Sequence, residues 1–239
     1  VRQAFHNFVQ KAERSGRYCH EEDERFTEQW SRIIMHLPYA YQAKRMFPDV
    51  FRHDREDTEM WKEVAKQLGP APEPHNSDDP VIIEIWEKAM DGYRRAISKT
   101  PQYLDFHASR IEKGQRASSL IGNQYTGSIF LALMSTFESD LEENVNLDNK
   151  LFGLCGYGSG AKAKVFEGKV SPNWREVVSR WNLFERLAGR VAIDHITYEN
   201  LHKGLQSGSV VEPEGEFALV EIGESGVQEG ARRYKWIDA

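Results

Sequence analysis

Three polar residues stand at predicted strand ends or turns, and their positions suggest a functional site. They are His36 in MHLPY, Asn123 in GNQYTGS and Ser159 in GYGSG. Ligands of α/β sheets bind outside strand ends, and a neutral imidazole or an amide can donate a hydrogen bond to a carbonyl oxygen that gains charge. Taken singly, a histidine at a strand end is more often structural, a Gly-Asn pair is usually a turn, and GYGSG lacks the lysine of a phosphate loop.

The chain has further candidate groups in its basic pairs and cysteines. Two basic pairs could meet the phosphates of a small ligand, although such pairs are more often solvated surface: Lys44 with Arg45, and Lys162 with Lys164. Cys19 lies in the polar connector GRYCHEE and Cys155 in a predicted strand, and neither belongs to a CxxC pair. We therefore expect two reduced thiols and no metal site.

The elements that must position these residues alternate between strands and helices. Short apolar runs predict strands at 31–36, 151–158 and 161–170, the last two as a hairpin, and a strand pair near the C-terminus. Apolar residues spaced near 3.6 predict a helix over 1–15, and Pro38 predicts another just past the histidine. We place His36 and Asn123 at strand-to-helix turns, and we expect an α/β fold with αβα layers and C-terminal antiparallel strands.

A helical segment over about 55–111 separates the two turns and is broken by the loop GPAPEPHNSDD. It contributes no motif. We therefore expect it to be an insertion outside the layers that hold the site, with a loop that tolerates shortening.

Composition excludes several classes of protein. The chain has 239 residues, and 40% of them are apolar, which is enough to form a folded core. We interpret residues 1–239 as one domain. A formal net charge of −6 disfavours a nucleic-acid partner. No stretch approaches the roughly 18 apolar residues of a membrane helix, and the N-terminus is too polar for a signal peptide, so we expect a cytoplasmic protein without a membrane partner.

In combination the motif blocks are specific. The segments FTEQWSRIIMHLPYAYQAKRMF, GNQYTGSIFLALMS and LFGLCGYGSGAKAKVFEGKV resemble 3-hydroxy-3-methylglutaryl-CoA synthase, a family of the thiolase superfamily. They match the C-terminal half of that enzyme in order, and the resemblance covers nearly the whole chain. Val1 is not a methionine, which leaves a fragment of a longer protein as one reading of the sequence.

The resemblance implies an acyltransferase of the mevalonate pathway of isoprenoid biosynthesis. The family condenses acetyl-CoA with acetoacetyl-CoA, and these CoA thioesters are substrates, so no cofactor is expected. The resemblance places the catalytic histidine at His36. It implies substrate-binding roles at six further positions: Asn123, Tyr125, Ser159, Pro38, Lys44 and Arg45.

Two departures from the family pattern matter. Many members have a lysine in H-x-P-Y-x-K, whereas this chain has Tyr41 there, which leaves the contacts to the CoA phosphates open. The cysteine nucleophile and the glutamate acid and base belong to an N-terminal half that nothing here resembles. We therefore expect this chain to be inactive alone and to pack against the missing N-terminal half of the same enzyme. We expect the full-length protein to be a homodimer.

Cys155 admits a second reading. Thiolases carry a catalytic base cysteine on a similar glycine-rich hairpin, but Cys155 falls one residue earlier, and a shift of one residue sends a strand side chain to the opposite face. A core position is therefore favoured.

Two alternatives to the mevalonate enzyme stay open. Related synthases act on acyl-carrier-protein thioesters in polyketide β-branching, and the motifs do not separate them from the CoA enzyme. A non-catalytic thiolase-fold binding module would also fit a chain that lacks the nucleophile.

Overall fold

One three-stranded sheet unites the predicted strands. In the computed structural model, which describes residues 1–18, 25–158 and 162–238, these are β1 (Trp30–Met35), β2 (Leu151–Tyr157) and β3 (Ala163–Lys169). β1 pairs in parallel with β2, and β2 pairs antiparallel with β3 as the predicted hairpin. β1 reads as a nearly continuous apolar run because parallel strands are covered on both faces.

Helices make up most of the rest of this unit, which the internal contacts delimit as residues 1–188. In chain order they are α1 (Arg2–Arg14), α2 (Gln42–Met46), α3 (Pro48–Arg55), α4 (Glu59–Leu68), α5 (Pro80–Ile97), α6 (Pro101–Arg110), α7 (Glu112–Ile121), α8 (Ser128–Glu142), α9 (Trp174–Val178) and α10 (Leu183–Ala188). No helix in the described ranges is long and apolar enough to cross a lipid bilayer.

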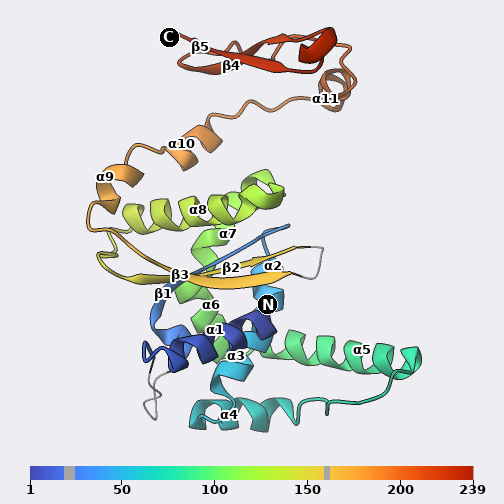
Figure 1. Cartoon of the computed structure of the whole chain (residues 1–239), viewed down its shortest axis with the longest axis vertical. Helices are drawn as coiled ribbons and strands as arrows, with labels where there is room; N and C mark the ends of the chain where they lie inside the picture. Colours follow the sequence, from blue (N-terminus) through green and yellow to red (C-terminus); the bar gives the residue numbers. More distant parts are fainter. Residues whose placement is uncertain (19–24, 159–161, 239) are drawn as a thin grey trace. The chain divides into compact units, whose positions relative to one another are not determined.

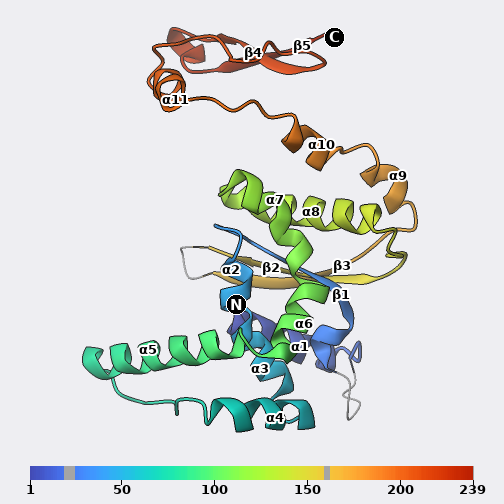
Figure 2. The same cartoon turned by 180° about the vertical axis from the view of Figure 1, so that it is seen from behind.

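The sheet lies between helices on its two faces. Both views show α8 along one face and α1 along the other, with α6 and α7 running past β1 (Figures 1 and 2). This is the αβα layering predicted from the alternation of strands and helices. The helix predicted over 1–15 is α1, which buries Phe5 and Ala12.

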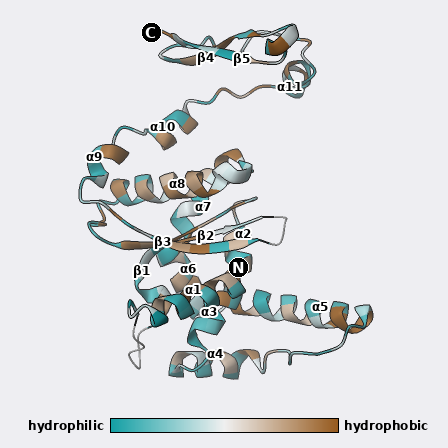
Figure 3. Cartoon of the chain, viewed as in Figure 1, coloured by the Kyte–Doolittle hydropathy of each residue, from teal (hydrophilic) through white to brown (hydrophobic). Residues whose placement is uncertain are grey.

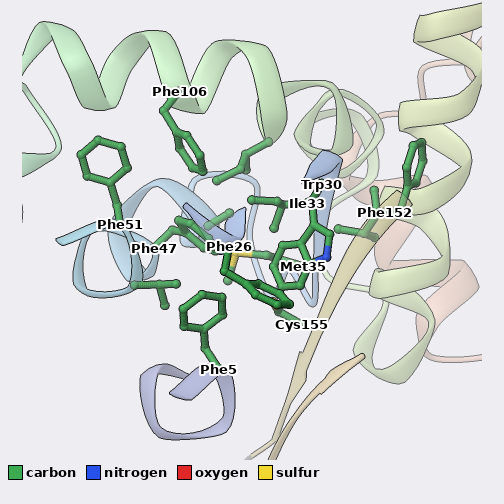
Figure 4. Close-up of a cluster of buried hydrophobic side chains, with 14 of the residues drawn as sticks. Phe5, Phe26, Trp30, Ile33, Met35, Phe47, Phe51, Phe106, Phe152 and Cys155 are labelled. Atoms are coloured by element: carbon green, nitrogen blue, oxygen red, sulfur yellow. The ribbon is translucent and has the colours of Figure 1, made fainter. Parts of the chain in front are cut away.

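An aromatic core fills the space between the sheet and α1, α3 and α6. Phe5, Phe26 and Trp30 meet edge to face, with ring centroids 5.4–5.9 Å apart. Figure 4 shows these rings near Phe47, Phe51 of α3 and Phe106 of α6. Side chains that are distant in sequence therefore hold the face of β1 that packs against these helices.

The expectation that 55–111 lies outside the layers is wrong for α6. Tyr103 is fully buried, and its hydroxyl donates to the carbonyl of Lys44 at 3.1 Å. Phe106 stacks on Phe47 with ring centroids 5.6 Å apart, and α6 contacts β1. The first half of α5 is exposed as expected, so the segment is a mixture of core helix and surface helix.

Two turns differ from their predicted context. The helix after His36 begins at Gln42 rather than at Pro38, and the proline that occupies a first helical turn is Pro48 of α3. Residues 116–121 belong to α7, so Asn123 follows a helix and not a strand. The physical reason is that residues 112–121 are mainly good helix formers, with small side chains at the contact with α8.

Residues 189–239 form a second unit with α11 (His195–His202), β4 (Glu216–Ile222) and β5 (Arg232–Ile237). The strands pair antiparallel, which confirms the predicted C-terminal strand pair. Phe217 packs edge to face on Trp236, and both remain about half exposed or more, as do other apolar residues of this hairpin, which colours brown in places (Figure 3).

The contact of β2 with Trp30 generates a stability prediction. A Cβ at Gly153 would lie 2.2 Å from Trp30 Cε3, whereas a Cβ at Gly156 of the same strand meets nothing within 4 Å. We predict that Gly153→Ala lowers the free energy of unfolding by about 1–3 kcal/mol, because the buried indole cannot move away. Gly156→Ala is the matched control. Urea unfolding measures both, and equal stability of the two variants would contradict the packing described.

Candidate functional site

His36 follows β1 directly and continues its pairing with β2. Its backbone N–H donates to the carbonyl of Cys155 at 3.0 Å. Its ring meets the ring of Tyr157 edge to face, with centroids 5.0 Å apart. The histidine therefore stands at a strand end on a backbone that the parallel ladder holds in place.

The hydroxyl of Ser128 determines the chemistry of the His36 ring. Ser128 begins α8, and its Oγ lies 2.6 Å from His36 Nδ1 and accepts the N–H of Leu37 at 3.0 Å. With one lone pair engaged by Leu37, the hydroxyl proton can be donated to Nδ1, which requires a neutral ring protonated at Nε2. Burial lowers the pKa of His36, which also favours the neutral form.

Asn123 and Tyr125 lie in the turn that leads into α8. Asn123 Oδ1 accepts the N–H of Tyr125 at 2.8 Å, which closes the turn and leaves the amide NH₂ as a donor. Tyr125 has a φ of 47°, in the left-handed region, and its side chain is 78% exposed. Because Ser128 ends this turn and contacts His36, the structure brings the histidine and the asparagine turn to the same edge of the sheet.

Tyr157 adds a second buried polar group beside the histidine. Its hydroxyl is shielded from solvent and makes no hydrogen bond of good geometry to the described residues. Burial raises the pKa of Tyr157 to about 12, against a smaller lowering by the side chain of Gln42. The phenol therefore keeps its proton at neutral pH.

The neighbouring residues Lys44 and Arg45 do not act together. The Lys44 charge lies close enough to the buried ring of His107 on α6 to help lower its pKa, after the larger effect of burial. Arg45 donates to the hydroxyl of Tyr39 at 2.8 Å and lines a cavity of about 580 Å³. Pro38 is half buried in the turn between them and β1.

That cavity is lined by arginines and by residues that follow His36 in the chain. Tyr39 and Arg45 line one side, and Arg94 and Arg95 of α5 line another. Asp49 pairs with Arg94 at 3.0 Å, which leaves Arg45 and Arg95 without an ion pair among the described residues. An anionic group would meet arginines from two separate helices there. The other basic pair, Lys162 and Lys164, is exposed on β3 and before it.

The described cysteine is a core residue. Cys155 is 1% exposed, and burial raises the pKa of its thiol to about 12. A thiol in that state is a poor nucleophile at neutral pH. Two predicted positions, Ser159 and Cys19, lie outside the described residues.

Residue-by-residue reasoning overlooked Ser128 and Tyr157. Both belong to the motif blocks, as the last residue of G-N-x-Y-T-x-S and the first of Y-G-S-G. Their place in those blocks was the available signal. Their role depends on contacts with His36 that span 92 residues for Ser128 and 121 for Tyr157, which no local pattern reveals.

Solved structures of similar proteins share this architecture. An MvaS protein in complex with 3-hydroxy-3-methylglutaryl coenzyme A is 25% identical, with a TM-score of 0.63 over 95% of this chain and 46% of that chain. PksG, an HMG-CoA synthase from Bacillus subtilis, shares the fold with a TM-score of 0.55 at 16% identity, over 96% of this chain and 47% of that one. The fold is therefore that of a thiolase-type half with a histidine at a strand end.

Sequence comparison narrows this class to one family. The model of the hydroxymethylglutaryl-coenzyme A synthase C-terminal family matches residues 1–207, so the chain belongs to that family. Hydroxymethylglutaryl-CoA synthase of Haloferax volcanii is 27% identical over 212 residues, which are 86% of this chain and 46% of that protein. The family resemblance seen in the motif blocks is confirmed. The chain spans about half the length of this curated relative.

The Ser128 contact generates a prediction about His36. We predict that Ser128→Ala leaves the chain folded but removes the hydrogen bond to Nδ1, so that the neutral ring becomes a mixture of its two tautomers. Its pKa should rise, because a hydrogen bond that favours the neutral form is lost while the lowering by burial remains. Ring ¹⁵N chemical shifts followed against pH measure both changes. Ser135→Ala is the control, because it removes another buried α8 hydroxyl that bonds to the backbone of Lys113 and Ala117. A His36 titration unchanged in Ser128→Ala would contradict the assigned contact.

Proposed function

We propose that this chain is the acetoacetyl-CoA-binding half of a hydroxymethylglutaryl-CoA synthase, which condenses acetyl-CoA with acetoacetyl-CoA in the mevalonate route to isoprenoids. The observation that carries the proposal is the contact between the Ser128 hydroxyl and Nδ1 of His36, at the end of β1, together with the burial that lowers the pKa of that ring. Membership of the family supports it. Each of the remaining roles is argued from residues near that ring.

The chemistry needs an uncharged hydrogen-bond donor that keeps its proton at neutral pH. With Nδ1 accepting from Ser128, Nε2–H of His36 donates to the thioester carbonyl of the acetoacetyl group and favours charge on that oxygen as the carbanion attacks. The Asn123 amide is a second donor toward the same substrate. Loss of one such donor typically costs roughly 3 kcal/mol of transition-state stabilisation.

The acetyl-carrying machinery belongs to another part of the enzyme. The resemblance assigns the cysteine nucleophile and the glutamate acid and base to the N-terminal half, and buried Cys155 is unsuited to the first role. Helix α8 is apolar over most of its length, as its brown colour shows, and Phe130 on it is 66% exposed. An apolar helix of this kind suits a position between two layers. We place the N-terminal half against it, within a homodimer.

The cavity lined by Tyr39, Arg45 and Arg95 suits the phosphates of the thioester carrier. Arg45 lies within nine residues of the histidine, and Arg95 approaches from α5. Arginine binds phosphate through several N–H groups. This pair compensates for Tyr41, which occupies the position of the family lysine.

The alternative of a carrier-protein substrate rests on fold likeness only. A curacin-pathway HMG synthase in complex with apo donor-ACP shares the fold at 17% identity, with a TM-score of 0.52. The relatives with detectable sequence similarity are named hydroxymethylglutaryl-CoA synthases. We therefore prefer the CoA substrate. A non-catalytic binding module would retain the fold without condensing thioesters, and the tests below separate these readings.

The isolated chain gives the first test. We predict no protein-bound label after incubation with labelled acetyl-CoA, because acylation requires a thiolate and the pKa of Cys155 lies at about 12. Mass spectrometry of tryptic peptides locates any label. Stoichiometric acetylation of Cys155 would overturn the proposal in favour of a thiolase-like role, and Cys155→Ala would verify the assignment.

The full-length synthase gives the second test. We predict that His36→Ala slows condensation on the order of 100-fold while acetyl-enzyme formation continues, because the ring contacts the acetoacetyl substrate and not the acetyl donor. Acetyl-enzyme formation and condensation are measured separately. Condensation at the wild-type rate would reduce His36 to a structural residue.

Combining Asn123→Ala with His36→Ala gives a double-mutant cycle. Both donors serve one substrate, so the double variant should lose less than the sum of the two single losses. Gln124→Ala, in the same turn, is the control. If acyl-carrier-protein thioesters replace the CoA substrates with higher kcat/KM, the polyketide alternative holds. If neither carrier supports condensation, the binding module remains.

A further inference from the structure

Two histidines face each other between α1 and α3, on the side of the sheet away from α8. His53 Nε2 lies 3.3 Å from His6 Nδ1, and the two ring centroids are 5.4 Å apart. Each ring is half buried. The simplest explanation of this contact is a single N–H···N hydrogen bond between the two rings.

The outer nitrogen of each ring is also engaged. The side-chain amide of Gln10 lies 2.8 Å from His6 Nε2, and Glu56 Oε1 lies 3.6 Å from His53 Nδ1. Glu56 presents an oxygen, the kind of atom to which a metal-binding ring commonly directs its second nitrogen. Gln10 instead presents its amide nitrogen to His6, while its Oε1 accepts from Arg14 at 3.5 Å. Metal binding at His6 Nδ1 therefore requires the Gln10 amide to turn over, so that its oxygen accepts Nε2–H. Both outer partners come from the same helix region as their ring, so they set its orientation locally.

Carboxylates and arginines surround the two histidines. The pair lines a cavity of about 340 Å³ together with Glu13, Asp54 and Asp57. Asp54 pairs with Arg55 and Asp57 with Arg25, so these carboxylates balance the local arginines and leave the two rings as the metal ligands. No group of three or more His, Cys, Asp or Glu side chains in the described ranges is already arranged around a metal. The protein would therefore supply two ligands, and water would supply the others.

We propose that His6 and His53 bind a divalent transition metal through Nδ1 and Nε2. Two imidazole nitrogens at about 2.0–2.1 Å from zinc in tetrahedral geometry lie roughly 3.3–3.4 Å apart, which matches the observed separation. Imidazole ligands suit zinc, copper and nickel, and carboxylates would select magnesium or calcium instead. The metal would take the place of the proton shared by the two nitrogens, and that proton would leave to solvent.

Such a site would join α1 to α3 without touching His36. The two helices already meet through the aromatic core, so the metal would add a second connection at their exposed side. The proposal does not depend on the proposed synthase function. Its test accordingly uses binding and stability, and no activity measurement.

Copper gives the direct test, because the electron paramagnetic resonance of Cu²⁺ resolves bound nitrogens. We expect the wild-type chain to bind one Cu²⁺ with two equatorial nitrogens, and His6→Ala and His53→Ala each to weaken binding by at least about tenfold, the loss typical even of an outer partner. His75→Ala is the control, since that ring contacts Trp86 on α5 instead. Circular dichroism verifies that each variant is folded.

Zinc gives an independent measurement. Added Zn²⁺ should raise the midpoint of thermal unfolding of the wild type and of His75→Ala, and should leave the His6→Ala, His53→Ala double variant unchanged. Equal Cu²⁺ affinity and equal Zn²⁺ shifts in all variants would overturn the proposal and reduce the pair to a hydrogen bond. A Gln10→Ala variant with intermediate affinity would support the role of the outer partner.

Discussion

A single serine hydroxyl links the strand that carries His36 to the helix that follows the asparagine turn. Ser128 Oγ contacts both the His36 ring and the Leu37 backbone, so it fixes the position of the ring and the local chain path together. The far end of α8 is held on the same strand, because Asp140 binds Arg32 through both oxygens at 2.5 and 2.8 Å. Helix α8 is thus attached to β1 near both of its ends.

The Asp140 contact shows how the position of α8 is specified. Its carboxylate is fully buried and also accepts from Lys113 of α7 at 2.7 Å. A buried ion pair adds little net stability over apolar packing, but it is costly to break, and it therefore disfavours alternative positions of the helix. The resulting register places Ser128 opposite His36.

The sequence predicted the sheet and the family well because those signals are local. Apolar runs marked β1 and β2, and the glycines near 158 marked the hairpin. The element before Asn123 was wrongly predicted as a strand, because a Gly-Asn turn can follow either a strand or a helix. The core role of α6 was also missed, since Tyr103 and Phe106 become core residues only through long-range contacts. Periodicity identifies a helix but not the surface that it covers.

The buried thiol of Cys155 makes the strand ladder observable. This residue faces Met35 in the β1–β2 register, and its carbonyl accepts the His36 N–H. A thiol reagent can reach its sulfur only when the core around it opens, so the rate of alkylation reports the free energy of local opening beside the histidine. Cys155, the free cysteine among the described residues, therefore serves as a probe of local opening in the strands that support His36.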